Sequence, residues 1–141
     1  MGFALIDLAM LSALGGDTES IRKNLFSDNN TDTLTYSNEF LLSESCYVGK
    51  IKNIFNPLPN QFREIDSQFT RIVCHLYQGI EKSVSALRSK FGRDRIAIIL
   101  GSSTSGIDSS ETPFKEREKT GVFPKDYFFK NQELGAGSIL L

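Results

Sequence analysis

Histidine, cysteine and tryptophan are scarce in this sequence. Its 141 residues include one histidine, His75, two cysteines, Cys46 and Cys74, and no tryptophan. A metal site built from these residue types needs three or four ligands at suitable spacing, and a disulfide framework needs cysteines in a paired spacing. The sequence provides neither, so we expect no metal, no disulfide and a reducing, cytoplasmic setting.

A catalytic pair is also missing. Cys74 and His75 are neighbours on a predicted helix and point about 100° apart around its axis, so they cannot face one another as nucleophile and base. No nearby basic group marks the Cys46 thiol as activated. Glu116 and Glu118 point to different faces of another predicted helix, which does not suit an acid–base pair. We therefore predict no catalytic residue and no cofactor.

The sequence also lacks an excess of charge of one sign and has no long apolar run. Sixteen basic residues against seventeen acidic ones leave a net charge of −1, and no basic patch suits a nucleic-acid backbone. The apolar start of the chain is too short to span a membrane. It also differs from a signal peptide, because the first basic residue of the chain is Arg22 and because Asp7 interrupts the apolar stretch. We expect no membrane span and no nucleic-acid partner.

The sequence is organised around residues 95–106, RIAIILGSSTSG. The apolar run Ile96–Leu100 is typical of a strand covered on both faces, which lies centrally in a parallel sheet. The glycines and hydroxyl residues of Gly101–Gly106 predict a tight turn at the carboxyl end of this strand, where open α/β sheets bind ligands. An ordinary strand-to-helix connection has the same composition, so the loop alone names no ligand.

The longest predicted element is a helix from about Ile65 to Phe91. Its apolar residues recur three or four positions apart, and they are Phe69, Ile72, Val73, Leu76, Ile80, Val84, Leu87 and Phe91. Gly92 is placed to end this helix in a left-handed cap. We expect the helix to pack against the central strand.

The amino-terminal part predicts a strand, a turn and a helix. Phe3–Met10 has the pattern of a strand, and Ser12–Gly16 that of a turn. Asp17 is a predicted helix cap before a short helix that runs to about Phe26. Together with the central strand and the long helix, these elements predict an α/β fold in which helices cover a mixed or parallel sheet.

The segments between residues 27 and 60 are predicted to contain little regular secondary structure. Ser27–Asn38 is rich in polar residues and predicts a surface loop. Phe40–Leu42 and Tyr47–Ile51 predict a short strand pair, and Asn56–Asn60 with its two prolines predicts a turn-rich connection.

Near its carboxyl end the chain predicts one more helix, Asp108–Lys119, with mixed charges and with Pro113 in its first turn. The aromatic run Tyr127–Phe129 then predicts either core packing or contact with a second surface.

Four segments of the chain resemble the amino-terminal part of β-ketoacyl-acyl-carrier-protein synthases, which are condensing enzymes of the thiolase-like fold. They are ALIDLAMLSALGGDTESIRKNLF, SALRSKFG, RDRIAIILGSSTSGID and GVFPKDYFFKNQELGAGS. The last segment is most similar to synthases of the aryl-polyene branch. The resemblance is weak between Ser27 and Asn60. It implies a partial thiolase-like α/β fold for residues 1–141.

The resemblance also implies where functional residues lie. The nucleophilic cysteine and two histidines of the family come beyond the segment matched here, so we expect this part of a synthase domain to lie before the catalytic cysteine and to carry no catalytic residue. The family loop near the acyl pocket corresponds to Gly101, Ser103, Thr104 and Gly106. The region that approaches the dimer partner corresponds to Phe128, Phe129, Gln132 and Glu133.

Two functions remain open at this point. The first is an amino-terminal segment of a synthase that joins acyl and malonyl thioesters with loss of carbon dioxide, in fatty-acid or polyene biosynthesis, inactive alone and acting on acyl carrier protein through the full-length enzyme. We expect it to form a homo-oligomer. The alternative is a non-enzymatic α/β module that binds a carrier protein or the other half of a split synthase. A phosphate-binding protein is disfavoured, because Gly101–Gly106 lacks the Lys-Ser or Lys-Thr ending of a nucleotide loop.

Overall fold

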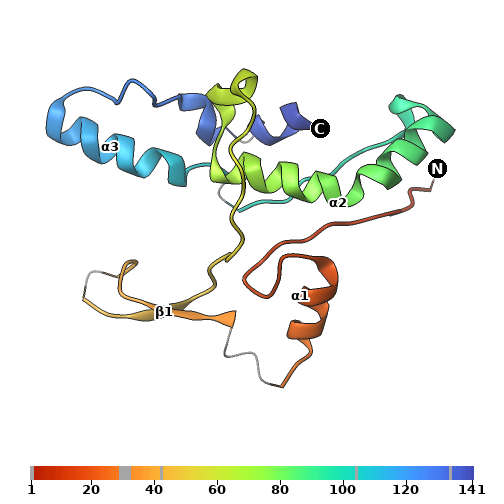
Figure 1. Ribbon diagram of the computed structural model, residues 1–141, viewed down its shortest axis with the longest axis horizontal. Helices are drawn as coiled ribbons and strands as arrows, with labels where there is room; N and C mark the ends of the chain where they lie inside the picture. The colour runs from red at the N-terminus through yellow and green to blue at the C-terminus, as the bar shows by residue number, and fades with distance from the viewer. Residues whose placement is uncertain (1, 29–32, 42, 104, 134) are drawn as a thin grey trace. The chain divides into compact units, whose positions relative to one another are not determined.

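A computed structural model describes residues 2–28, 33–41, 43–103, 105–133 and 135–141 (Figure 1). The chain divides into two compact units, Met1–Ile54 and Phe55–Leu141. Its elements, in chain order, are α1 (Thr18–Leu25), β1 (Thr35–Ser37), β2 (Cys46–Val48), η2 (Asn60–Ile65), α2 (Gln68–Phe91), η3 (Arg93–Arg95), α3 (Asp108–Thr120), η4 (Phe129–Gln132) and η5 (Ala136–Leu140). In the part of the chain that the structure describes, no helix combines the length and apolar character needed to cross a membrane.

Helix α1 begins at the predicted cap. The Asp17 carboxylate accepts a hydrogen bond from the Ser20 amide at 2.8 Å, and the Ser20 hydroxyl accepts one from the Asp17 amide at 3.3 Å, which completes a capping box. The turn before the helix is confirmed, since the amide of Ser12 donates to the Gly15 carbonyl and the reverse bond also forms, each at 3.1 Å. Ile21 faces inward at 4% exposure.

The predicted strand Phe3–Met10 is not formed. This segment has no strand assignment, and its apolar side chains face outward, with Phe3 fully exposed and Leu5 at 81% exposure. A strand exists only through hydrogen bonds to a neighbouring strand, and the described residues supply none for this segment.

The small sheet of this unit confirms the predicted strand Tyr47–Ile51 in part, since β2 includes Tyr47 and Val48, but β2 pairs with β1 and not with the predicted Phe40–Leu42. Strands β1 and β2 are antiparallel, with Tyr36 opposite Tyr47 and their ring centroids 5.0 Å apart. Strand β1 therefore lies inside the predicted loop Ser27–Asn38, and Phe40 lies in a bend, while Leu42 is outside the described residues. The facing aromatic pair explains this register, because cross-strand side-chain contacts stabilise a sheet.

Helix α2 dominates the second unit and begins at Gln68, three residues after the predicted start at Ile65, with Ser67 as its N-cap. The helix ends at the predicted glycine, but Gly92 has φ 81° and ψ 157°, so the prediction of a left-handed helical cap is wrong. This extended conformation with positive φ is open to glycine, which has no Cβ. The next helix, α3, does end in a left-handed glycine, Gly121, with φ 81° and ψ −7°.

The core of this unit lies on the first half of α2. Thr70 is fully buried, Val73 is 2% exposed and Phe69 8% exposed, and Ala136 of η5 packs with them at 1% exposure. Close approach of η5 depends on Gly137, where an added Cβ would lie 3.1 Å from the side chains of both Phe69 and Val73. In Figure 1 the carboxyl-terminal turn accordingly lies along α2.

Pro113 is the sixth residue of α3, so the prediction that it lies in the first turn is wrong. The helix starts at Asp108, as predicted, which is five residues before the proline, and there the amides of Ser109 and Ser110 donate to the carbonyls of Gly106 and Ile107, at 3.1 and 3.0 Å. These two hydrogen bonds span three residues each, as in a 3-10 turn, and they form the start of the helix before Pro113.

The central strand predicted at Ile96–Leu100 is not assigned either. The segment is extended, with φ −119° and ψ 136° at Ile96, but among the described residues no strand pairs with it. Its far face is open, and Ile99 is 92% exposed. The pattern predicted a strand covered on both faces, whereas Ile98 and Leu100 are also exposed, at 37% and 36%.

Candidate functional site

The loop after Ile96–Leu100 is the candidate site, and its first half faces solvent. Gly101 and Ser103 are exposed, and a Cβ added at Gly101 would meet nothing within 4 Å. Thr104 lies outside the described residues. Ser105 has a positive φ of 52°, and its amide donates to the Ser102 hydroxyl at 3.2 Å, which closes a turn. Residues 105–107 form a turn, and the part of the predicted turn at Thr104 lies outside the described residues.

The second half of the loop is anchored through Gly106. This residue is buried, and an added Cβ would overlap the main-chain carbonyl oxygen of Asn131 in η4. The same position lies 3.2 Å from the Ser67 hydroxyl at the start of α2. A glycine is required here by this close approach. The loop, the cap of α2 and η4 thus meet at one point.

Polar side chains join α3 to η4 beside this contact. Ser110, 5% exposed, donates its hydroxyl to the Gln132 side-chain oxygen at 3.0 Å and lies 3.2 Å from the Tyr127 hydroxyl. The Gln132 amide donates to the same Tyr127 hydroxyl at 3.4 Å. Gln132, expected from the family resemblance to approach a dimer partner, therefore also forms contacts inside its own unit.

The other residues expected at the partner-facing region lie nearer the surface. Phe129 is 63% exposed and Glu133 is exposed. Phe128 is half-buried, with the Arg63 guanidinium carbon 5.7 Å from its ring centroid.

An exposed ion pair ties η4 to η2. The Lys130 ammonium lies 2.7 Å from a Glu64 carboxylate oxygen. Their hydrogen bond lowers the pKa of Glu64 and raises the pKa of Lys130. Solvent screens a pair at this exposure, so it orients η4 rather than stabilising the unit strongly.

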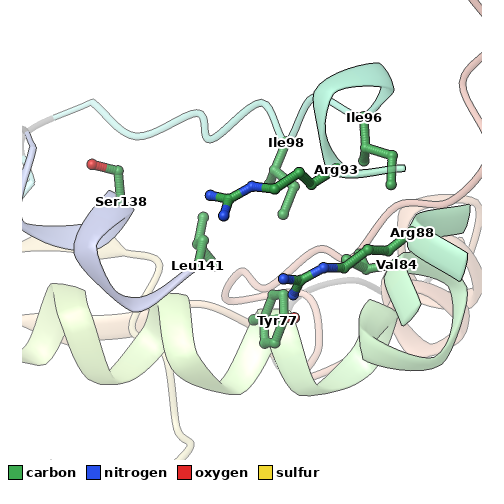
Figure 2. A pocket seen from close by; sticks show the side chains of 8 residues that line it. All are labelled: Tyr77, Val84, Arg88, Arg93, Ile96, Ile98, Ser138 and Leu141. Atoms are coloured by element: carbon green, nitrogen blue, oxygen red, sulfur yellow. The ribbon is translucent and has the colours of Figure 1, made fainter. Parts of the chain in front are cut away.

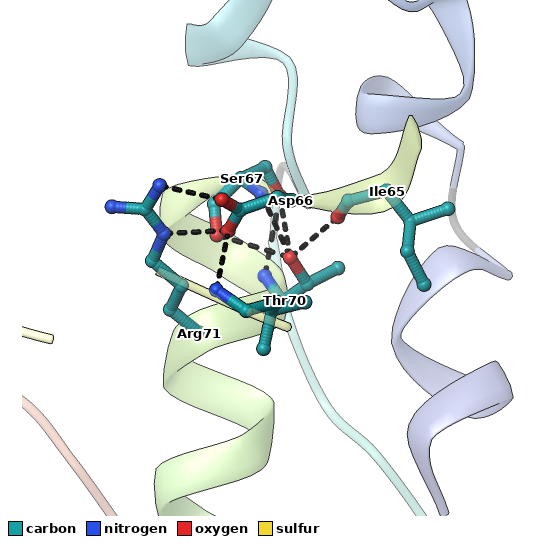
Figure 3. Close-up of polar contacts among 6 residues, drawn as sticks. Ile65, Asp66, Ser67, Thr70 and Arg71 are labelled. Carbon is teal, nitrogen blue, oxygen red and sulfur yellow. Dashed lines mark hydrogen bonds and ion pairs between the residues drawn. The ribbon is translucent and has the colours of Figure 1, made fainter. Parts of the chain in front are cut away.

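The start of α2 lies next to the loop through Ser67 and is held in place by hydrogen bonds of its own (Figure 3). The Ser67 amide donates to the Thr70 hydroxyl at 2.9 Å, the Thr70 amide donates to the Ser67 hydroxyl at 3.2 Å, and the Thr70 hydroxyl donates to the Ile65 carbonyl at 2.6 Å. Arg71 clamps Asp66 through two hydrogen bonds, of 2.6 and 2.8 Å. These bonds lower the pKa of the Asp66 carboxyl and raise the pKa of Arg71.

A separate open groove of about 340 Å³ lies between α2 and residues 93–98, which comprise η3 and the start of the extended segment (Figure 2). Both arginines in it extend their guanidinium groups into the open space. Its lining residues are Tyr77, Val84, Arg88, Arg93, Ile96, Ile98, Ser138 and Leu141.

The remaining candidates from the sequence belong to other elements than the loop. Cys46 is in β2, and Cys74 and His75 are half-buried on α2, where the His75 ring packs against Phe55 with centroids 5.2 Å apart. Within the described residues no three ligating side chains gather as a metal site would need. The loop region offers hydroxyls, backbone groups and a rigid support, which suit binding and positioning.

The loop and the 128–133 region were predicted to lie at separate sites. The structure brings their ends together through Gly106 and Asn131, and it adds Ser67 and Ser110, which the sequence did not single out. Only the second glycine of the loop gave a signal, because a small residue is required wherever backbones approach closely. No pattern indicated which backbone would approach it.

No protein-family model matches the chain, and no curated protein matches it. Among solved structures it matches a chain of the ketosynthase ApeO in complex with its chain length factor ApeC, from Xenorhabdus doucetiae. The match has a TM-score of 0.74 and 25% identity over 94% of this chain. The chain spans 34% of the length of that protein. The resemblance to ketosynthases, most similar to their aryl-polyene branch, is thereby confirmed, and the chain has part of a ketosynthase fold.

Proposed function

We propose that residues 1–141 are a non-catalytic, amino-terminal part of a β-ketoacyl-acyl-carrier-protein synthase. The observation that supports this most is the structural match over 94% of the chain, which corresponds to one third of the matched protein. In such an enzyme an acyl thioester condenses with a malonyl carrier-protein thioester and carbon dioxide is lost. The described residues contribute no nucleophile paired with a base, so their part in the reaction is to shape and position.

Within this proposal the loop Gly101–Gly106 borders the acyl pocket. Its first half is exposed and carries small hydroxyl side chains, so it can form a wall against an acyl chain. Its second half is held by the buried contact of Gly106 with Asn131, which fixes the position of that wall. Gly101, Ser103, Thr104 and Gly106 are thus positioning residues in this proposal.

The proposal also includes partners. Acyl carrier protein would bind to the complete enzyme. A second subunit, most simply in a homodimer in the cytoplasm, would be approached by Phe128, Phe129, Gln132 and Glu133. The exposed ring of Phe129 supports a contact there.

A chimera tests the proposal. Residues 1–141 replace the matched third of the solved chain, which is then assembled with its natural partner protein and supplied with acyl and malonyl carrier protein. We expect the chimera to condense them, and the 141-residue chain alone to release no carbon dioxide and to form no thioester on Cys46 or Cys74. A folded chimera without condensing activity would contradict the proposal, as would stoichiometric acylation of the isolated chain detected by mass spectrometry.

The alternative of a non-enzymatic interaction module is favoured by one observation. The matched structure is a complex of two proteins, a ketosynthase and its chain length factor. A module of this fold could therefore act by association with a synthase-like partner. If the chimera folds and assembles but does not condense thioesters, while the isolated chain binds such a partner, this alternative holds.

A further inference from the structure

Two arginines from different elements of the second unit extend into one groove. Arg88 lies in the last turn of α2 and Arg93 at the start of η3, and Figure 2 shows both guanidinium groups in the open space between these elements. All of the residues that line the groove belong to the second unit, and none of them is acidic. Two positive charges therefore share a groove whose described lining side chains carry no negative charge.

The turn at Gly92 brings the two arginines to the same groove. The Gly92 amide donates to the Arg88 carbonyl at 3.0 Å, which ends α2. With φ 81° and ψ 157°, Gly92 then has a backbone conformation that L side chains rarely adopt, and the chain turns into η3. Because α2 and η3 are in contact, Arg93 can line the same groove as Arg88.

Most other arginines of the chain have a partner that this pair lacks. In the described residues, four of them contact a carboxylate or an aromatic ring, and they are Arg22, Arg63, Arg71 and Arg117. The same part of the chain provides neither kind of partner for Arg88 or Arg93. Like charges in one groove repel one another, and a bound anion would offset that repulsion.

The groove combines these charges with apolar side chains. Tyr77 and Val84 of α2 and Ile96, which follows η3, line it and are half-buried. Sites for small molecules typically have such an apolar lining with a few polar groups that fix the orientation of the ligand. The planar guanidinium group matches phosphate oxygens through paired hydrogen bonds. Two guanidinium groups also balance the roughly two negative charges of a phosphate monoester at neutral pH.

We infer that Arg88 and Arg93 form a binding site for a small organic phosphate, in which the two guanidinium groups hold the phosphate and an apolar body packs against Val84 and Ile96. The site is distinct from the candidate loop, because neither arginine belongs to Gly101–Gly106 or to the 128–133 region. The inference is therefore independent of the proposed function, and the activity of the chimera does not decide it.

Phenyl phosphate is the probe, because it joins a phosphate monoester to a single aromatic ring. Nuclear magnetic resonance of the 141-residue chain follows its titration at low salt. We expect saturable shifts at the amides around Arg88 and Arg93, with a Kd of about 1 mM or tighter. Added salt should weaken the binding, because both arginines are exposed and ions screen their charge. Absence of saturable binding overturns the inference.

Inorganic phosphate and benzoate separate the two parts of the ligand. Inorganic phosphate lacks the apolar body, and benzoate has one negative charge instead of two. Each should bind at least about fivefold more weakly than phenyl phosphate. Equal affinity for inorganic phosphate would overturn the role of the apolar wall, and equal affinity for benzoate would overturn the assignment to a phosphate.

Arg88→Gln and Arg93→Gln should each weaken the binding of phenyl phosphate about tenfold at low salt, because each removes one charge-assisted contact. Arg95→Gln is the matched control, since Arg95 is also an exposed residue of η3 but does not line the groove. All three variants should keep the circular dichroism spectrum and melting temperature of the original protein, because the three side chains are exposed. Equal weakening in all three would mean that net charge, and not the groove, attracts the phosphate, and would overturn the inference.

Discussion

Gly106 lies so close to the main-chain carbonyl of Asn131 that no side chain fits between the loop and η4. This contact joins the segment that resembles the acyl-pocket loop to the segment that resembles the partner-facing region. Because a backbone carbonyl cannot move aside as a flexible side chain can, the contact fixes the relative position of the two segments within their unit.

We predict that Gly106→Ala destabilises the protein. The added methyl group overlaps the Asn131 carbonyl, and overpacking in a core costs about 1–3 kcal/mol. Gly101→Ala is the matched control, because its Cβ would meet nothing within 4 Å. Urea denaturation should show a lower midpoint for Gly106→Ala only. Equal midpoints for the two variants would show that the loop does not pack on η4.

Ser67→Ala should remove the side-chain half of the capping box of α2. The loss of an N-cap hydroxyl costs about 1 kcal/mol. Ser89→Ala serves as the control, because the exposed Ser89 hydroxyl only donates back to the Ser85 carbonyl within the helix and alanine is the better helix former. Thermal unfolding should lower the melting temperature of the first variant and leave the second unchanged or slightly raised. The opposite order would refute the cap.

The Asp66–Arg71 pair should make stability depend on acid pH. The hydrogen bonds from Arg71 hold the pKa of the Asp66 carboxyl below its ordinary value, so folding favours the ionised form. This contribution is fully present above the unfolded-state pKa of about 3.9 and disappears as pH falls through the lower folded-state pKa. This contribution should be about 1 kcal/mol, the usual net contribution of a hydrogen bond, because the contact is bidentate but solvent still reaches the pair, with the Asp66 and Arg71 side chains 16% and 28% exposed.

Asp66→Asn tests this dependence in denaturation curves between neutral and strongly acid pH. The variant should be less stable than the original protein at neutral pH, and the difference should vanish below the folded-state pKa. Glu64→Gln is the control, since the Glu64 and Lys130 side chains are 60% and 59% exposed and solvent screens their attraction. A constant difference between Asp66→Asn and the original protein at all pH values would contradict the linkage.

Phe129→Glu should weaken self-association if the 128–133 region meets a second copy. The ring is 63% exposed, so the variant should fold normally while placing a charge in the contact. Phe26→Glu is the control, because Phe26 is 79% exposed and lies outside this region. Light scattering at high protein concentration should show a smaller average mass for Phe129→Glu alone. A monomeric original protein would contradict the homodimer itself.

The elements that local chemistry determines were predictable from the sequence. The cap at Asp17 and the spacing of apolar residues on α2 both act within a few residues, so their helices appear where expected, to within three residues at the start of α2. The turn Ser12–Gly15 is equally local. The family resemblance added the fold, which the match to a ketosynthase complex supports.

Features that depend on distant partners were not predictable in the same way. Phe3–Met10 and Ile96–Leu100 have strand patterns, but a pattern does not supply the neighbour with which a ladder forms. The pairing of Tyr36 with Tyr47 and the contact of Gly106 with Asn131 each join residues far apart in the chain. Their register depends on tertiary packing, and the periodicity of one segment carries no information about it.

The burial of Thr70 has a consequence for local unfolding of α2. Its hydroxyl donates a hydrogen bond to the Ile65 carbonyl and so links the first turn of the helix to the buried core of the unit. In the last turn, by contrast, Phe91 is 52% exposed. Opening the first turn must break core packing, but opening the last turn breaks few contacts. The helix therefore has one end that unfolds only with the whole unit and one that frays independently, and the candidate loop is anchored to the end that does not fray.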